Sequence, residues 1–287
     1  MIPFWLRALA TYCHHSPLKR GQSRLISWAY RRYHPAGTTL TDSLLDGTLP
    51  IQLDLTIWID FNIYCQGLYE YYLAAWFKSQ LKADTVFLDV GAYIGQYALL
   101  AAQVALSGRV YAFEPNPHSF QRLAQSRQRH HFNHLQLLPM AVGSQTGNLP
   151  FYLADEPFQS STIATHAAYN QTIAVPLIGL DDFCRQEGLK RVDLLKIDVE
   201  EAEDAVIAGA MALLERFRPG IIIEIGGQAI RAGQSNALNH LQTLGYHFWE
   251  MRSGRIIPLT ALHPPSTNVI ALPATSYLPP APFPQGK

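Results

Sequence analysis

The strongest pattern of hydrophobic positions in the chain is an apolar run over residues 85–90, followed by a glycine turn and an Ala/Leu-rich run over residues 96–102. A short run rich in β-branched and aromatic residues is typical of a buried strand, and the second run predicts a helix. Similar short apolar runs at residues 109–113 and 192–197 are each followed by a helical pattern. Strands that alternate with helices predict an α/β fold with a parallel sheet.

Other stretches add elements to this frame. Residues 1–41 predict one or two short helices, and the alternation of apolar residues over 49–63 predicts a β segment. Further helices are expected over 71–81, 117–131 and 235–244, and further strands over 135–139, 219–225, 246–251 and 267–272, the last two as a hairpin at the sheet edge.

The helical pattern disappears between residues 141 and 175, where turn residues dominate. Two strands at 149–153 and 173–177 predict a hairpin insertion over the crevice at the carboxyl ends of the parallel strands, where such sheets bind ligands. Ser160, Ser161 and His166 lie on its loop and are candidates to meet the substrate, although polar loop residues are more often merely at the surface.

Composition and charge narrow the function classes. The chain of 287 residues has a net charge of zero and is 48% hydrophobic, which gives no reason to expect a partner nucleic acid. Its three cysteines are far apart, so neither a disulfide framework nor a metal site is indicated. No apolar stretch is long enough for a conventional membrane span, and no signal peptide pattern is seen, so a cytoplasmic location is expected.

The N-terminal segment differs from the rest in charge. Before Asp42 it contains no acid, while aromatic residues are interleaved with six basic residues: Arg7, Lys19, Arg20, Arg24, Arg31 and Arg32. Such a segment can lie on an anionic membrane surface. The alternative is a helical cap on the catalytic domain with a solvated basic face. We expect residues 1–66 to form this extension, residues 67–273 the catalytic domain, and residues 274–287 a Pro-rich tail.

The glycine turn indicates which ligand the first strand meets. Its spacing, Gly91-x-x-x-Gly95, lacks the middle glycine that lets a dinucleotide pyrophosphate touch the backbone, because Tyr93 stands there. Asp89 at the strand end would repel a pyrophosphate and attract a sulfonium or ammonium group. The turn therefore favours S-adenosylmethionine over NAD, although a nicotinamide oxidoreductase, or a tight turn without any ligand, stays open.

A second acid supports a nucleoside site. Glu114 ends the strand at 109–113, about 20 residues after the glycine turn, where a carboxylate is placed to accept the hydroxyl groups of a ribose. Its alternative role is to cap the helix that begins near Pro117.

The third informative stretch surrounds Asp198. The strand at 192–197 brings Lys196 and Asp198 to the sheet edge beside the glycine turn, where chemistry is expected. Asp198-x-x-Glu201 also has the spacing of a capping box, in which backbone amides would lower the pKa of the carboxyl and make it a weaker base.

Together, the stretches 89–95, 112–117 and 196–203 resemble FkbM-type S-adenosylmethionine-dependent methyltransferases in order and spacing, and the resemblance covers roughly residues 67–225. It implies a Rossmann-like class I methyltransferase fold, a mostly parallel seven-stranded sheet with helices on both faces, here with an N-terminal helical segment. It also implies O-methylation of a hydroxyl group on a sugar, a glycolipid or a secondary metabolite.

The resemblance also assigns residues. Asp89, Gly91 and Gly95 would bind the methionine end of the cofactor and Glu114 its ribose, while Glu70 would contact the cofactor or brace the turn. Ala92, Tyr93, Pro115 and Asn116 complete the expected cofactor site.

For the chemistry, we expect Asp198 to act as the base that accepts the hydroxyl proton, Lys196 to orient it, and Glu200 or Glu224 to line the acceptor side. One departure is Glu201, since the family usually has glycine there. It implies a smaller, more acidic acceptor pocket, a capping role, or a non-catalytic S-adenosylmethionine-binding module. The oligomeric state cannot be read from the sequence.

Overall fold

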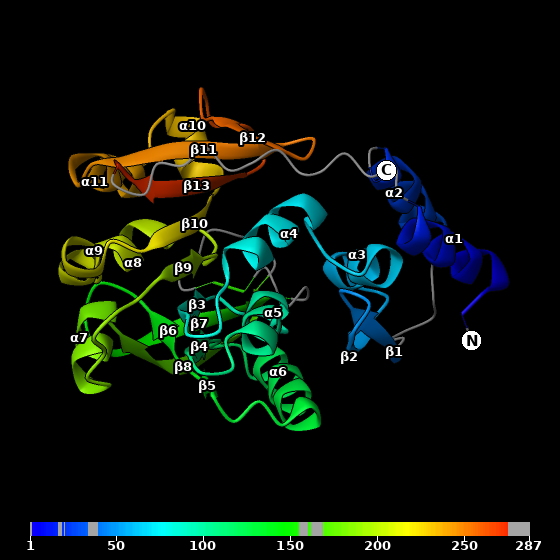
Figure 1. Ribbon diagram of the computed structural model, residues 1–287, viewed down its shortest axis with the longest axis horizontal. Coiled ribbons are helices and arrows are strands. Elements are labelled where there is room, and N and C mark those ends of the chain that lie inside the picture. The colour runs from blue at the N-terminus through cyan, green and yellow to red at the C-terminus, as the bar shows by residue number, and fades with distance from the viewer. Residues whose placement is uncertain are drawn as a thin grey trace.

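The computed structural model describes residues 2–16, 19, 21–33, 40–154, 160–161 and 169–274. Its centre is an eight-stranded sheet in the order β12-β11-β13-β10-β9-β3-β4-β5 (Figure 1). The strands are β3 (Val86–Val90), β4 (Arg109–Phe113), β5 (Leu135–Leu138), β9 (Leu194–Ile197), β10 (Gly220–Ile225), β11 (Tyr246–Arg252), β12 (Arg255–Pro258) and β13 (Thr267–Pro273).

Strands β5, β4, β3, β9 and β10 run parallel, and β13, β11 and β12 add antiparallel pairings at one side. The α/β expectation is thereby confirmed, but the sheet has eight strands and not seven. The additional strand, β12, folds back on β11 through the turn at Ser253 and Gly254, both of which have positive φ. The expected pairing of residues 246–251 with 267–272 is present, since β11 and β13 pair antiparallel, but β12 lies outside them at the sheet edge and β13 inserts between β10 and β11.

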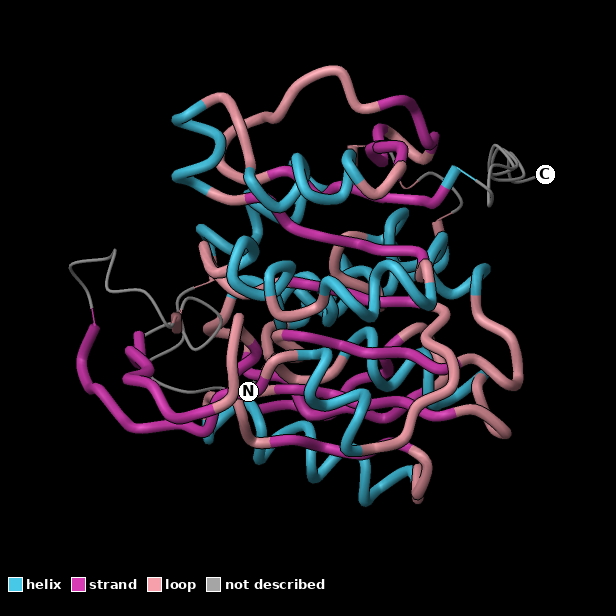
Figure 2. The backbone as a smooth tube through the Cα atoms, turned by 90° about the vertical axis from the view of Figure 1, so that its left-hand side faces the viewer, coloured by secondary structure: helices cyan, strands magenta, loops and turns pink. Residues whose placement is uncertain are grey.

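Helices cover both faces of the sheet (Figure 1), and Figure 2 shows its strands one above another. Neighbouring residues of a strand point to opposite faces, so Phe87 packs in the cluster with α4, α5 and α6, and Leu88 in the cluster with α7, α8, α9 and α11. The helices are α4 (Tyr71–Gln80), α5 (Gln96–Val104), α6 (Pro117–His130), α7 (Leu180–Gln186), α8 (Glu203–Ala208), α9 (Met211–Phe217), α10 (Gly227–Ala232) and α11 (Asn236–Thr243).

The N-terminal extension forms a lobe at one end of the molecule (Figure 1). It consists of α1 (Phe4–His15), α2 (Gln22–Arg32), the antiparallel pair β1 (Leu40–Leu45) and β2 (Leu49–Asp54), and α3 (Trp58–Gln66). The expected β segment over 49–63 is therefore correct only up to Asp54. Because α3 buries residues on nearly all of its faces, its sequence carries no helical periodicity that would distinguish it from a strand.

The insertion after β5 forms a separate three-stranded sheet of β6 (Ala141–Val142), β8 (Tyr169–Ile178) and β7 (Gly147–Ala154). The expected hairpin is present, since β7 and β8 pair antiparallel. His166 and the Pro-rich segment 275–287 lie outside the described residues. No helix in the described part of the chain is long and apolar enough to cross a membrane. Cys13, Cys65 and Cys184 are buried free thiols.

Candidate functional site

The turn after β3 needs its glycines for close packing. Gly91 has φ +80°, and a Cβ atom there would lie 1.8 Å from the backbone oxygen of Asp198. Gly95 has φ +92°, and a Cβ atom there would lie 2.2 Å from Cδ1 of Leu123. The amides of Gly91 and Ala92 both donate to the backbone oxygen of Phe113, at 3.0 Å each. These contacts hold the ends of β3, β4 and β9 together around one point.

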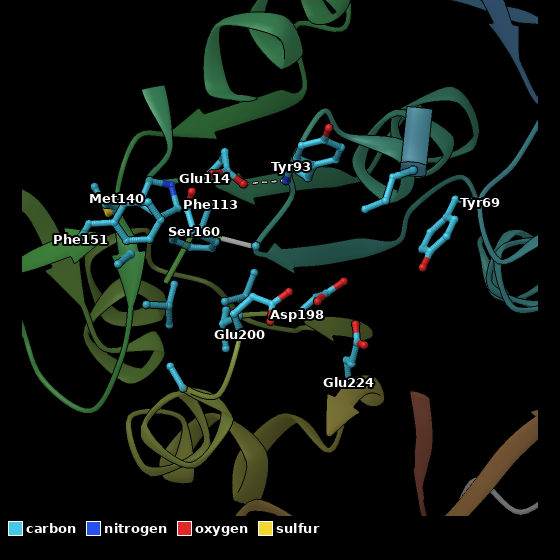
Figure 3. Close-up of a pocket in the computed structure, with 18 residues that line it drawn as sticks. Tyr69, Tyr93, Phe113, Glu114, Met140, Phe151, Ser160, Asp198, Glu200 and Glu224 are labelled. Carbon is cyan, nitrogen blue, oxygen red and sulfur yellow. Dashed lines mark hydrogen bonds between the residues drawn. The ribbon is translucent and has the colours of Figure 1, made fainter. Parts of the chain in front are cut away.

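A cavity opens at that point, at the carboxyl ends of β3, β4, β9 and β10 (Figure 3). This is the edge at which open parallel sheets bind ligands. Its acidic side chains come from three strand ends, and no lysine or arginine is among its described lining residues. The residues around it are Ile59, Tyr69, Val90, Gly91, Tyr93, Phe113, Glu114, Pro115, Met140, Ala141, Val142, Phe151, Ser160, Asp198, Val199, Glu200, Ala202 and Glu224.

Glu114 is held at the cavity by the backbone. Its Oε2 accepts the Tyr93 amide at 2.7 Å and its Oε1 accepts the Asn116 amide at 2.8 Å. Burial raises the pKa of Glu114 to about 7, although both hydrogen bonds act in the opposite direction. The helix that follows is capped by Asn116, whose Oδ1 accepts the amides of His118 and Ser119. Glu114 is therefore not the cap, and each of its oxygens keeps a lone pair for a ligand hydroxyl.

The other side of the cavity is apolar. Phe113, Met140 and Phe151 face one another there, away from the carboxylates of Asp198, Glu200 and Glu224 (Figure 3). An apolar wall beside a carboxylate suits a nucleoside, because the flat base buries apolar surface while the ribose keeps its hydroxyl groups on Glu114.

Asp198 lies where β9 ends. Its Oδ2 accepts a hydrogen bond of 2.6 Å from Nζ of Lys196, and its amide donates to the Val90 oxygen at 2.9 Å. Burial alone would raise the pKa of Asp198, but the Lys196 ammonium and the neighbouring Glu224 hold it below its ordinary value. Burial and the charge of Asp198 raise the pKa of Glu224 well above its ordinary value. The opposite directions of these two shifts favour the charge on Asp198 and the proton on Glu224.

The loop after Asp198 has an unusual backbone. Glu200 and Glu201 both have positive φ, 42° and 73°. Glu200 points into the cavity, and burial followed by the charge of Asp198 raises its pKa to about 8. Glu201 points away from the cavity into a second hollow, where its Oε1 lies 3.7 Å from Nη2 of Arg231.

The role of Glu201 differs from every structural expectation. It does not narrow the main cavity, because it does not line it. It does not cap α8 either, since that helix begins at Glu203 after Ala202, with no side-chain cap. The capping box Asp198-x-x-Glu201 is thus wrong, and instead the Glu201 amide donates to Oε1 of Glu203 at 3.0 Å.

A second layer of charge lies beneath the cavity. Asp89 pairs in register with Lys196, is 1% exposed, and has no hydrogen bond of ordinary geometry to either carboxylate oxygen. Burial raises its pKa to about 7. Glu70 accepts hydrogen bonds from Asn268 at 2.5 Å and Tyr97 at 3.4 Å, and burial raises its pKa to about 7. Neither acid lines the cavity, and the Lys196 ammonium opposes the rise in the pKa of both.

Two buried contacts position the tyrosines of the cavity wall. Gln96 accepts the Tyr69 amide at 2.7 Å and donates to the Tyr69 oxygen at 3.0 Å. The Tyr93 hydroxyl donates to Oδ1 of Asp60 at 3.0 Å, and Asp60, which is fully buried, is paired with Arg122. Asp60 of the N-terminal lobe therefore helps to position Tyr93 in the cavity wall.

The inserted hairpin covers the cavity at two points. Asn116 donates to Oγ of Ser160 at 3.1 Å, and Oγ of Ser161 donates to the Glu200 oxygen at 2.7 Å. These hydrogen bonds join the ends of β4 and β9 across the site. The position expected for the insertion is thus correct for the part of its loop that is described.

The structure brings together most of the expected site. The cavity is lined by seven of the expected cofactor and catalytic residues: Gly91, Tyr93, Glu114, Pro115, Asp198, Glu200 and Glu224. Six do not line it: Glu70, Asp89, Ala92, Gly95, Asn116 and Lys196. Lining residues that sequence reasoning did not assign to the site include Ile59, Met140 and Phe151. The only sequence signals for the last two are the apolar run after β5, which contains Met140, and the alternation in β7, which contains Phe151. No group of three metal-ligating side chains is found among the described residues.

Comparison with known proteins decides the family. Residues 89–251, more than half of the chain, match the methyltransferase FkbM domain. The chain belongs to the FkbM methyltransferase family. The expected methyltransferase is confirmed at the level of the family, whose cofactor is S-adenosylmethionine.

Relatives of this FkbM chain include two curated enzymes. The 2-O-methyltransferase NoeI of Sinorhizobium fredii is 26% identical over 168 residues, which cover 53% of this chain and 68% of NoeI. The hexuronic acid methyltransferase AglP of Haloferax volcanii is 28% identical over 149 residues, or 51% of this chain and 58% of AglP. Among solved structures, the methyltransferase FkbM of Methylobacillus flagellatus shares 16% identity at a TM-score of 0.44, covering 76% of this chain and 54% of that one.

The cavity fits the cofactor of the FkbM family in charge and in its apolar wall. The acidic lining has no basic residue among its described members, and Phe113, Met140 and Phe151 offer apolar surface to the base. A sulfonium ligand would lower the pKa of Glu114 and Glu200 toward their ordinary values, because an adjacent positive charge favours a carboxylate. The raised pKa values in the free protein are therefore consistent with a site built for a cation.

Proposed function

We propose that this FkbM methyltransferase transfers the methyl group of S-adenosylmethionine to a hydroxyl group of a sugar, a glycolipid or a secondary metabolite. The observation that carries the proposal is the cavity at the strand ends, where Glu114 faces an apolar wall and Asp198 lies across from it. The names of NoeI and AglP, a 2-O-methyltransferase and a hexuronic acid methyltransferase, support a sugar hydroxyl as the acceptor.

In this proposal each residue has one task. S-adenosylmethionine supplies an electrophilic methyl group on a positively charged sulfur. Glu114 accepts the ribose hydroxyls. Asp198 accepts the proton of the acceptor hydroxyl as the new bond forms, since the Lys196 ammonium and the neighbouring Glu224 favour its ionised form by lowering its pKa.

Lys196 fixes the geometry of that step. Burial would lower its pKa, but the charges of Asp198 and Asp89 outweigh burial and raise it, so the ammonium stays charged and keeps its 2.6 Å hydrogen bond to Asp198. A carboxylate held in one orientation raises the share of bound acceptor molecules that are aligned for in-line transfer. The hairpin contacts of Ser160 and Ser161 fix the ends of β4 and β9 relative to each other at the same place.

The decisive test is Asp198→Asn. We expect kcat to fall by about 10²–10⁴-fold, the usual contribution of a general base, with little change in the Kd for S-adenosylmethionine. Turnover is measured by mass spectrometry as methyl transfer to a panel of sugars and glycolipids, and Kd by calorimetric titration.

Glu200→Gln is the matched control, since it replaces another carboxyl group of the cavity with an amide but leaves Asp198 and Lys196 paired. A small loss of activity in this control, together with a large loss in Asp198→Asn, supports Asp198 as the general base. If Asp198→Asn loses only cofactor affinity or thermal stability, the base is another residue. If the wild-type chain binds S-adenosylmethionine but methylates no hydroxyl, it is a binding module.

A further inference from the structure

Exposed apolar side chains are concentrated on the first two helices. Of the large hydrophobic side chains that are exposed in the described chain, only Leu106 lies outside the N-terminal lobe. The five on α1 and α2 are Phe4, Trp5, Tyr12, Leu25 and Trp28, with Phe4 86% and Trp28 56% exposed. Two exposed tryptophans on neighbouring helices are unusual for a surface that faces only water.

The two helices present these rings on one continuous surface. The rings of Trp5 and Trp28 meet edge to face, with centroids 6.0 Å apart, so the outer sides of α1 and α2 join at this pair. On α1, Tyr12 lies two turns from Trp5 on the same side of the helix, and on α2, Leu25 lies one turn from Trp28. We call this surface, made of Phe4, Trp5, Tyr12, Leu25 and Trp28, the aromatic face.

The opposite sides of both helices are already packed. Leu6 and Cys13 of α1 and Ile26 and Ala29 of α2 are fully buried in the same core as Phe61 of α3. The helices are therefore fixed to the body of the protein by one side each. The aromatic face does not serve the core of the chain as described, and another partner must explain it.

Positive charge surrounds the aromatic face. Arg24 and Arg31 flank Trp28 at helical spacing on α2, Arg32 is exposed beside them, and Arg7 is exposed on α1. No ion pair involves these four arginines among the described residues, and the sequence has no acid before Asp42. The charge of this surface is thus not neutralised from within its own segment.

We propose that the aromatic face and its arginines dock on the surface of an anionic phospholipid membrane. Tryptophan and tyrosine have a preferred place at the level of the lipid headgroups, and arginines attract anionic lipids there. A second copy of the chain is a poorer partner, because a symmetric contact through this face would place arginines opposite arginines.

The test is co-sedimentation of the full chain with vesicles of phosphatidylcholine, with and without phosphatidylglycerol. We expect binding to the anionic vesicles, weakened by added salt. The pair Arg24→Gln and Arg31→Gln should lower the partition coefficient by about tenfold or more, since each surface arginine contributes a factor of about five. Trp5→Ser with Trp28→Ser should lower it by at least about fivefold through lost apolar contact.

Two controls keep the result interpretable. Leu106→Ser removes an exposed apolar side chain, 69% exposed, on the other part of the protein and should leave vesicle binding unchanged. Each variant is checked for an unaltered Kd for S-adenosylmethionine, which shows that the fold is intact.

Three results would overturn the proposal. They are no binding to anionic vesicles, equal binding to vesicles without charge, and a wild-type dimer by light scattering that Trp5→Ser with Trp28→Ser converts to a monomer. The last result would assign the face to a second copy. None of these outcomes bears on methyl transfer, so the proposed function is tested separately.

Discussion

Glu200 and Glu201 occupy consecutive left-handed backbone positions in the loop after β9, with φ of 42° and 73°. A residue with a Cβ atom is strained there by roughly 1–2 kcal/mol relative to glycine. The geometry explains why the family usually has glycine where this chain has Glu201. The chain keeps the loop conformation in spite of its side chain, and Glu201 has one buried oxygen, Oε2, with no hydrogen-bond partner.

Glu201→Gly should therefore stabilise the protein. We expect a gain of about 1 kcal/mol in the free energy of unfolding, or a rise in Tm of about 2–4 °C, from relief of backbone strain. Calorimetric unfolding measures it. Glu201→Gln separates the effect of the strained backbone from that of the buried carboxylate, because it removes the charge and keeps the positive φ. If the glycine variant is less stable than wild type, the packing of Glu201 over Gly226 and Gly227 outweighs the strain.

At the scale of elements, the cavity depends on segments far from the catalytic motifs. The inserted hairpin joins the ends of β4 and β9 through Ser160 and Ser161. The N-terminal lobe reaches the glycine turn through Asp60 on α3, which accepts from Tyr93 and pairs with Arg122 on α6. The lobe is thus a structural part of the cavity wall and not only a cap on the domain.

Tyr93→Phe tests this coupling. Loss of the hydrogen bond to buried Asp60 should cost about 1–2 kcal/mol of stability and weaken S-adenosylmethionine binding several-fold, because the ring in the cavity wall loses its anchor. Tyr97→Phe is the matched control, since Tyr97 is also buried and bonded to an acid, Glu70, but does not line the cavity. Equal cofactor Kd values for the two variants and wild type would show that the lobe does not position the site.

Over the whole molecule, opposite charges are separated. Basic residues gather in the N-terminal segment, whereas the cavity gathers Glu114, Asp198, Glu200 and Glu224. Burial raises the pKa of Glu114 to about 7 and that of Glu200 to about 8, so both are partly protonated in the free protein at neutral pH. A bound cation favours their ionised forms, so binding releases protons and tightens as pH rises through these values.

The affinity for S-adenosylmethionine should therefore increase from about pH 6 to about pH 8, by roughly tenfold if a single carboxyl with a pKa of about 7 in the free protein loses its proton on binding. Calorimetric titration in buffers of different ionisation enthalpy counts the protons directly. S-adenosylhomocysteine, which lacks the sulfonium charge, should show a weaker pH dependence. Equal slopes for the two ligands would mean that the carboxylates do not sense that charge.

The sequence alone determined the local parts of this protein. The strands at 86–90 and 109–113, the turn at Gly91 and Gly95, and the acids that end the strands follow from periodicity and from backbone preferences, which act over a few residues. Motif order was enough to indicate the family and its cofactor. It was also enough to place Glu114 and Asp198 at one edge of the sheet.

Only the tertiary structure decided which of these residues meet the cavity. Asp89 and Glu70 do not line it, and Asn116 caps α6. The side chain of Glu201 lies in a second hollow. The sequence also did not predict that β13 inserts between β10 and β11. Nor did it predict that Asp60 pairs with Arg122, 62 positions further along the chain. The physical reason is that burial, side-chain direction and strand order depend on packing between distant segments, which leaves no local pattern in the sequence.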